Sequence, residues 1–210
     1  MNRVLLVDED PVFRLGLCKL LNAAQSALTI VETESFANAK VLLREVPGIA
    51  LVILDLKLRD CGGFVDLFEM RSEFPEVPII VLSTNADPES ASRTMSFGAA
   101  GYISKSAPSD TIVQTVKTTL SGRPWAHGSI AARACQVNPI ATLSRTQLRV
   151  LAGLKRGLRN KQIAFEMGVT EKTVKSYMST LYRKLGVSSR TQALILLQEV
   201  LSNTRIQQVS

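Results

Sequence analysis

Acidic residues follow two of the short apolar runs in the first sixty residues, at Asp8-Glu9-Asp10 and at Asp55. If these runs are strands of one parallel sheet, the carboxylates meet at one edge, because parallel strands share the direction of their carboxyl ends. Such a cluster repels itself unless a cation lies within it. Oxygen ligands without His or thiolate favour a hard ion, and Mg²⁺, held by few carboxylates and by water, fits best. Asp10 is expected to be a solvated acid.

Hydroxyls and an amine follow later apolar runs. Ser83 and Thr84 come after the fourth run, and Lys105 comes after the fifth. A hydroxyl and an ammonium beside a metal-bound carboxylate can together hold the three oxygens of a phosphoryl group. The sequence therefore predicts a phosphoryl-binding site at this edge of the sheet.

The elements that must position these residues alternate over the first 120 residues. Runs rich in β-branched residues and Leu predict strands at 4–7, 29–32, 51–54, 79–82 and 101–104. Stretches long enough for crossover helices separate or follow them, at 11–21, 37–44, 64–74, 89–97 and 110–120. This alternation predicts a doubly wound α/β fold, with a five-stranded parallel sheet and helices on both faces.

A second set of residues with recognisable chemistry lies in the last third of the chain, which is strongly basic. Residues 143–210 contain 12 Lys and Arg against 3 Asp and Glu, whereas residues 1–124 contain 12 against 15. A basic module joined to a mildly acidic one is typical of nucleic-acid binding. A basic surface kept for solubility is the alternative.

One helix at 171–185 is expected to carry much of this chemistry. Apolar residues share one of its faces: Val174, Met178, Leu181 and Leu185. Basic and hydroxyl residues lie on the opposite face or at its flank: Lys172, Lys175, Ser176, Ser179 and Arg183. After a short helix at 160–167 and a turn at 168–170, this helix has helix-turn-helix spacing and fits the major groove of DNA. Lys161 and the amides near Asn160 are placed to clamp the DNA backbone. The alternative is an ordinary surface helix with a solvated basic face.

A segment with two Pro and two Gly, at 121–139, separates the two parts. We expect one domain at 1–122, a linker at 123–142, and an all-α domain of four helices at 143–210. Ser144-x-x-Gln147 and Ser189-x-x-Gln192 are capping-box signals for two of these helices. Leu143 and Leu148 stand at the positions of a hydrophobic staple around the first box.

Composition excludes several other classes of protein. Hydrophobic residues make up 46% and charged residues 20% of the chain, which is enough apolar material for a packed core. The longest apolar run, at 49–54, is far shorter than the roughly 18 residues that cross a bilayer, and no signal peptide is expected. Cys18, Cys61 and Cys135 are scattered and His127 is the single His, so neither a disulfide framework nor a zinc site is expected. A cytoplasmic location fits this cysteine usage.

An ordered set of motifs runs through residues 3–122: an acidic pair, an Asp after the third strand, a hydroxyl after the fourth, and Tyr-x-x-Lys around the fifth. In order and spacing this set resembles the CheY-like receiver domain of response regulators. The resemblance implies a flavodoxin-like fold in which Asp55 accepts a phosphoryl group. It implies that Mg²⁺ is bound by Asp8, Glu9, Asp55 and the backbone carbonyl of Lys57. It also implies phosphoryl-binding and switch roles for Ser83, Thr84, Tyr102 and Lys105.

Four residues, at three places in the chain, depart from the usual receiver pattern. Glu9 stands where Asp is usual, Leu58-Arg59 where Met-Pro is common, and Ser106 where many receivers have Pro. Glu9 is longer by one methylene and must still place an oxygen about 2.1 Å from Mg²⁺. A degenerate receiver that keeps the fold without being phosphorylated is therefore an alternative. For Tyr102, a plain packing role is the alternative to a switch.

The basic domain contains a longer set of motifs: LS at 143–144, VL at 150–151, GLRNKQIA at 157–164, TVK at 173–175 and KLGVxSRTQA at 184–193. These closely resemble the LuxR-type helix-turn-helix of NarL/FixJ response regulators over residues 143–200. The resemblance implies a recognition helix at 171–184 and DNA contacts by Asn160, Lys161, Lys172, Thr173, Lys175, Ser176, Ser179 and Arg183. It implies dimerisation through the helix at 190–201, whose Leu and Ile residues could equally be core. Arg145 and Tyr177 depart from the frequent Pro and His, and we expect little effect of Tyr177 on DNA binding.

Together these features predict a two-component response regulator and not an enzyme. A sensor histidine kinase is expected to phosphorylate Asp55, and the second domain to bind promoter DNA. A homodimer in the active state and RNA polymerase are further expected partners, and no membrane is involved. One alternative is a DNA-binding transcription factor with a pseudo-receiver, regulated without phosphorylation. Another is a phosphatase or hydrolase using the carboxylate pocket, for which the sequence offers no separate substrate-pocket signature.

Overall fold

The computed structural model describes residues 2–24, 28–84, 88–123 and 139–202. The chain divides into two compact units, Met1–Ala134 and Cys135–Ser210. Within the described ranges, no helix is both long enough and apolar enough to cross a bilayer.

The first unit contains a five-stranded sheet in the order β2-β1-β3-β4-β5, and every neighbouring pair is parallel. Its strands are β1 (Asn2–Val7), β2 (Leu28–Thr33), β3 (Ile49–Asp55), β4 (Ile79–Ser83) and β5 (Gly101–Ser104). Because the strands all run the same way, their carboxyl ends lie along one edge. That edge brings together residues that are far apart in the sequence.

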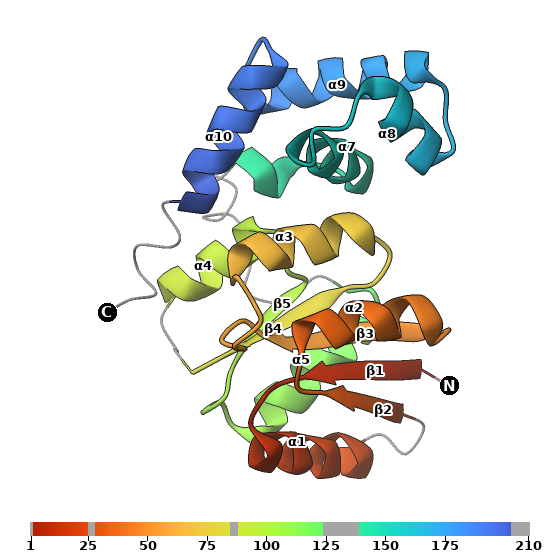
Figure 1. The fold of residues 1–210 in the computed structure, drawn as a ribbon. Coiled ribbons are helices and arrows are strands. Elements are labelled where there is room, and N and C mark those ends of the chain that lie inside the picture. The colour runs from red at the N-terminus through yellow and green to blue at the C-terminus, as the bar shows by residue number, and fades with distance from the viewer. Residues whose placement is uncertain (1, 25–27, 85–87, 124–138, 203–210) are drawn as a thin grey trace. The chain divides into compact units, whose positions relative to one another are not determined.

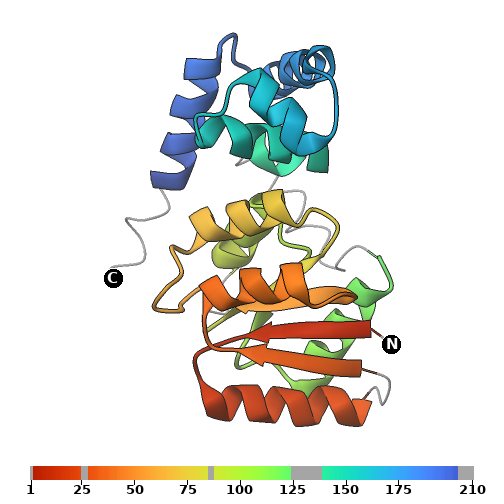
Figure 2. The same cartoon turned by 45° about the vertical axis from the view of Figure 1, so that its right-hand side comes forward.

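Helices cover both faces of this sheet, as Figures 1 and 2 show. On one face lie α1 (Pro11–Ala24) and α5 (Ser109–Leu120). On the other lie α2 (Phe36–Glu45), α3 (Phe64–Glu73) and α4 (Pro88–Ser96). A helix in each connection provides the long crossover that parallel neighbours require.

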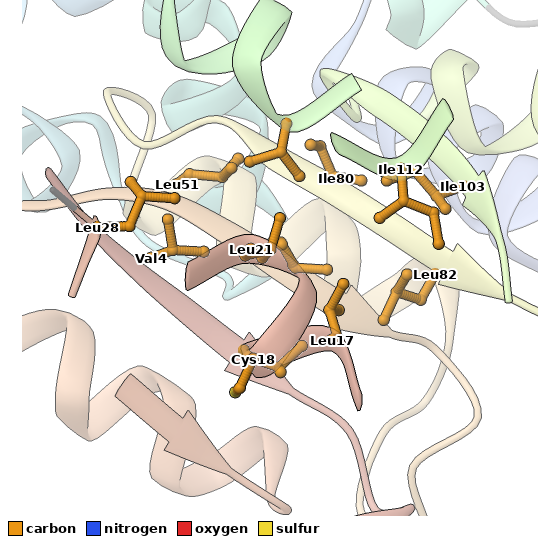
Figure 3. Close-up of a cluster of buried hydrophobic side chains, with 13 residues drawn as sticks. Val4, Leu17, Cys18, Leu21, Leu28, Leu51, Ile80, Leu82, Ile103 and Ile112 are labelled. Carbon is orange, nitrogen blue, oxygen red and sulfur yellow. The ribbon is translucent and has the colours of Figure 1, made fainter. Parts of the chain in front are cut away.

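The core between α1, α5 and the sheet is formed by aliphatic side chains (Figure 3). Leu17 and Leu21 of α1 are one helical turn apart and are 3% and 2% exposed, and Ile112 of α5 joins the same cluster. Strand residues Val4 and Ile80 meet them from the sheet. Full burial of a side chain of this size contributes about 1.5–3 kcal/mol, so this layer holds the edge residues in place.

The predicted order of strands and helices is confirmed, and the doubly wound parallel fold with it. The ends differ by a few residues. Asp55, expected just after its strand, is the last residue of β3 and pairs in register with Leu82 of β4. Ser83 likewise ends β4 and pairs with Ser104 of β5. Pairing with neighbouring strands extends both strands beyond their apolar runs.

The second unit is helical over its described part. It contains a short 3₁₀ helix, η1 (Pro139–Thr142), and the helices α7 (Arg145–Lys155), α8 (Asn160–Met167), α9 (Glu171–Leu185) and α10 (Arg190–Ser202). Ile140 of η1 is 2% exposed, and the Lys184 ammonium donates to the Thr142 carbonyl over 2.8 Å. These contacts join η1 to the end of α9.

The helix-turn-helix spacing is confirmed: α8 and α9 are separated by the turn at 168–170. Gly168 has φ 67°, a left-handed conformation that suits glycine, and Thr170 then caps α9 by accepting from the Thr173 amide. The turn at Gly168 ends α8, and the cap at Thr170 sets the first residue of α9.

The two predicted capping boxes have different outcomes. At Ser144 both bonds form, since the Ser144 hydroxyl accepts from the Gln147 amide and the Gln147 side chain accepts from the Ser144 amide. Before α10 only half of the box forms. Ser189 accepts from the Gln192 amide, but the Gln192 side chain accepts from Ser188 instead. The Gln192 side chain thus bonds to Ser188, one residue before the expected partner Ser189.

Candidate functional site

The carboxyl edge of the sheet brings two buried carboxylates and one ammonium together. Asp8, directly after β1, is 0% exposed, and Asp55, at the end of β3, is 4% exposed. Lys105 follows β5, and its Nζ lies 2.7 Å from Oδ2 of Asp8 and 2.7 Å from Oδ2 of Asp55. The strand order makes β1 and β3 neighbours, and the Lys105 side chain crosses β4 to reach them.

The remaining carboxylate oxygens accept from backbone amides. Oδ1 of Asp55 accepts from the Lys57 amide over 2.7 Å, and Oδ1 of Asp8 accepts from the Asp10 amide over 2.9 Å. Oδ2 of Asp8 is buried and accepts no hydrogen bond of good geometry, although the Lys105 ammonium is close. Its close contact is the ion pair with Lys105, so a further cation would have to share this oxygen with the ammonium.

Lys105 is the positive centre of this cluster. Burial disfavours its charged form, but hydrogen bonds and charge from Asp55 and Asp8 outweigh that and raise the pKa of Lys105. Its Nζ also lies 4.8 Å from the centroid of the Phe13 ring, within cation–π distance. The ammonium therefore stays protonated and is held in place by the two carboxylates and the Phe13 ring. A positive charge fixed in this way suits the binding of an anion.

Glu9, the expected third acid, has a different partner. Its Oε2 lies 3.5 Å from Nε of Arg59, whose side chain is 94% exposed. In the described part of the chain no three carboxylate, imidazole or thiol groups gather closely enough to form a metal site on their own. The buried carboxylates Asp8 and Asp55 nevertheless offer oxygen donors, the ligands that hard cations take, so the chemistry of the pocket fits such an ion.

The expected phosphoryl-binding and switch residues lie on or near this edge. Ser83 ends β4, and its carbonyl accepts from the Lys105 amide over 2.7 Å. Thr84 follows it, exposed, and its hydroxyl accepts from the Lys57 ammonium over 2.8 Å. Tyr102 lies on β5 and is 7% exposed. The roles of these three residues in binding a phosphoryl group stay predictions.

Asp10 does more than the solvated acid expected of it. It is exposed, yet its Oδ1 accepts from the amides of Val12 and Phe13 at the start of α1. The bond from the Phe13 amide is the main cause of a lowered pKa for Asp10. An Asp followed by Pro at the start of a helical stretch is the sequence signal for this N-cap.

Asp60 was not singled out from the sequence at all. It lies in the loop after β3 and reaches the start of α2, accepting from the Ser35 hydroxyl and from the amides of Phe36 and Ala37 over 2.8–3.0 Å. Burial raises its pKa, but these hydrogen bonds outweigh it and leave the pKa of Asp60 lowered. Asp60 thus fastens the loop that carries Lys57 and Arg59.

In the second unit, α9 separates its faces as predicted. Its apolar residues are buried: Val174, Met178, Leu181 and Leu185. Five of the residues expected to face DNA are exposed: Lys172, Lys175, Ser176, Ser179 and Arg183. The sixth on this helix, Thr173, is half-buried. Lys175 lies 3.3 Å from Glu171 one turn earlier. At the start of α8, Lys161 is exposed and Asn160 half-buried.

Two models of known protein families match the chain. The model for the response regulator receiver domain matches residues 4–117. The model for bacterial regulatory proteins of the luxR family matches residues 141–197.

Curated relatives match over nearly their whole length. The DNA-binding transcriptional activator DevR/DosR of Mycobacterium tuberculosis is 32% identical over 210 residues, covering 95% of each chain. The transcriptional regulatory protein YdfI of Bacillus subtilis is 30% identical over 203 residues, covering 92% of this chain and 93% of its own.

Solved structures give the same fold. A two-component response regulator of the LuxR family from Aurantimonas is 27% identical with a TM-score of 0.55, covering 64% of this chain and 95% of that one. RcsB of Salmonella enterica, bound to the promoter rprA with the phosphomimetic BeF₃⁻, is 21% identical with a TM-score of 0.55, covering 94% of this chain and 99% of that one.

Proposed function

The chain belongs to the response regulators that join a receiver domain to a LuxR-type DNA-binding domain, and from this we propose that a phosphoryl group on Asp55 controls its binding to promoter DNA. Its relatives are transcriptional regulators rather than enzymes. The observation that carries the proposal is the pair of 2.7 Å contacts between Lys105 and two buried carboxylates, Asp8 and Asp55.

The proposed reaction moves one phosphoryl group. A carboxylate oxygen of Asp55 forms a bond to phosphorus while the bond from phosphorus to a histidine nitrogen of the kinase breaks, and the electron pair stays on that nitrogen. Lys105 neutralises charge on the phosphoryl oxygens, and the hydroxyl of Ser83, the last residue of β4, would hydrogen-bond to one of them. Bound Mg²⁺ would supply further positive charge for the same oxygens.

The residues proposed to hold Mg²⁺ are Asp8, Asp55, Glu9 and the backbone carbonyl of Lys57. The two neighbouring buried carboxylates, Asp8 and Asp55, support this assignment best. Glu9 would first have to leave Arg59, a partner whose near-complete exposure makes the ion pair weak. Thr84 and Tyr102 are proposed to act as switch residues that respond to the phosphoryl group and do not bind the metal.

The DNA-binding surface is proposed to be the exposed face of α9 together with the start of α8. Lys172, Lys175 and Arg183 supply charge for phosphate or guanine, and the hydroxyls of Thr173, Ser176 and Ser179 suit either phosphate or base edges. Asn160 and Lys161 would hold the DNA backbone at the amide end of α8. RcsB, a relative in fold, binds promoter DNA, which supports the same role here.

The proposed partners follow from this arrangement. A sensor histidine kinase would donate the phosphoryl group, and the exposed apolar residues Val12 and Leu15 on α1, beside the capping Asp10, offer it a contact surface. A homodimer through α10 and a contact with RNA polymerase are proposed as well, in the cytoplasm. We propose domain bounds of 1–122 and 143–210, with a linker at 123–142.

The test is phosphorylation of Asp55→Asn by a small donor such as acetyl phosphate. We expect the wild-type protein to be labelled in the presence of Mg²⁺ and not after chelation, and Asp55→Asn not to be labelled. Asp110→Asn, an exposed Asp at the start of α5, is the matched control and should label normally. Full labelling of Asp55→Asn would overturn the assignment.

A pseudo-receiver is the second candidate, and the Glu9–Arg59 ion pair is the observation that favours it. In this case the second unit would bind DNA without phosphorylation. The same labelling experiment separates the two functions, because a pseudo-receiver would take no label in either metal condition.

A further inference from the structure

A second ammonium lies at the rim of the carboxylate pocket, on Lys57. Its side chain is exposed, and its Nζ donates to the Thr84 hydroxyl over 2.8 Å, joining the loop after β3 to the end of β4. The backbone of the same residue donates to Oδ1 of Asp55 over 2.7 Å. The backbone of Lys57 is therefore bonded to Asp55 of β3, while its side-chain amine is bonded to Thr84, directly after β4.

A phosphoryl group on Asp55 carries more negative charge than the carboxylate alone, so a cation in addition to Lys105 and the proposed Mg²⁺ would stabilise it further. Lys105 already serves both Asp8 and Asp55, so its single charge is shared before any phosphoryl group arrives. Arg59 serves Glu9. Of the cations described at this edge, Lys57 is the one whose partner is a neutral hydroxyl.

We propose that Lys57 is a phosphoryl-binding residue which Thr84 holds aside in the unphosphorylated protein. On phosphorylation the ammonium leaves Thr84 Oγ1 and contacts an oxygen of the phosphoryl group on Asp55. The flexible four-carbon side chain allows this turn while the backbone bond to Asp55 stays in place. The inference rests on the proposed phosphorylation of Asp55.

Removing the Lys57 amine and removing the Thr84 hydroxyl are expected to change the affinity for a phosphoryl analogue in opposite directions. The contact of Lys57 with the phosphoryl group exists only in the bound state, so its loss weakens binding of a phosphoryl analogue. The hydrogen bond to Thr84 exists only in the free state, so its loss strengthens binding. A hydrogen bond that merely stiffens the rim would give both substitutions the same sign.

The experiment titrates beryllofluoride, a phosphoryl analogue, into the full-length protein with Mg²⁺ and follows the bound form by ¹⁹F NMR. Lys57→Met is expected to weaken binding about threefold to fivefold, the range of a partly exposed charge pair, and Lys57→Arg to restore most of it. Thr84→Val is expected to tighten binding about twofold and to have no effect in the Lys57→Met background.

Two controls separate this inference from the function on which it rests. Lys19→Met removes an exposed charge from α1 and should bind like the wild type, whereas Asp55→Asn should not bind. If the wild type binds and Lys57→Met binds equally well, the inference is overturned and the proposed function stands. Weaker binding by Thr84→Val in both backgrounds would make Thr84 itself the phosphoryl contact and would equally overturn it. If the wild type neither binds nor takes label, both proposals fail.

Discussion

The ammonium of Lys105 balances two carboxylates that have almost no access to water, Asp8 and Asp55. Without it, two like charges would remain buried side by side, which is costly because desolvation penalises each and Coulomb repulsion adds to it. At the scale of single residues, the chemistry of the site and its stability therefore depend on the same amine.

Lys105→Met is expected to lower the free energy of unfolding by about 2–4 kcal/mol, somewhat below the full range for a buried pair because the lysine side chain stays 15% exposed. Mg²⁺ should recover more stability in this variant than in the wild type, since it can replace the missing charge. Thermal unfolding with and without Mg²⁺ checks both effects. Equal shifts by Mg²⁺ in the two proteins would contradict the expectation.

Asp60→Ala is expected to cost about 1 kcal/mol at neutral pH, the usual size of a side-chain acceptor's contribution at a helix N-terminus, although the N-cap residue Ser35 remains. The folded-state pKa of Asp60 is lowered, so its contribution is present above the unfolded-state pKa and is lost as pH falls through the folded value. The difference between Asp60→Ala and wild type should therefore shrink below about pH 4. Urea unfolding at pH 7 and pH 3 measures this, and an equal difference at both would refute it.

At the scale of elements, α7 and α8 meet so closely that one methyl group decides their packing. A Cβ added at Gly153 of α7 would lie 2.8 Å from Cγ1 and 3.0 Å from Cδ1 of Ile163 on α8. Ile163 is 1% exposed and has little room to move. Gly153 thus allows the Ile163 side chain of α8 to pack directly against the backbone of α7.

Gly153→Ala is expected to destabilise the protein by about 1–3 kcal/mol, because overpacking outweighs the better helix propensity of Ala. Gly16→Ala is the matched control, since Gly16 lies in α1 with nothing within 4 Å of an added Cβ. There the same change should stabilise by up to about 1 kcal/mol. Chemical unfolding of both variants provides the measurement, and two changes of the same sign would count against this packing.

Local patterns were enough to predict the elements and the residues at their ends. Short apolar runs gave the five strands, and Asp55 and Lys105 follow from parallel strands having one carboxyl edge. The same patterns could not predict the partner of Glu9 or the reach of Asp60 to α2, because both depend on how one loop folds against another element. Hydrogen bonds between loops leave no periodic signal in a sequence.

At the scale of the whole molecule, the two units carry charge of opposite sign, and the basic one holds the proposed DNA surface. Lys175→Ala should weaken binding to cognate and random duplexes alike, and flatten the slope of log affinity against log salt by about 0.9. Its free-state partner, Glu171, would be replaced by a phosphate. Lys19→Ala in the first unit is the control. Unchanged affinity and slope for Lys175→Ala would mean that this flank of α9 does not meet DNA.

The site at the sheet edge also has a consequence for synthesis. Its acids come from β1 and β3, and its amine follows β5, so a ribosome makes both buried carboxylates long before their counter-charge. A nascent chain that ends before residue 105 cannot complete the pocket or neutralise it. If Asp55 is phosphorylated as proposed, only a first unit synthesised beyond residue 105 would contain the complete acceptor site.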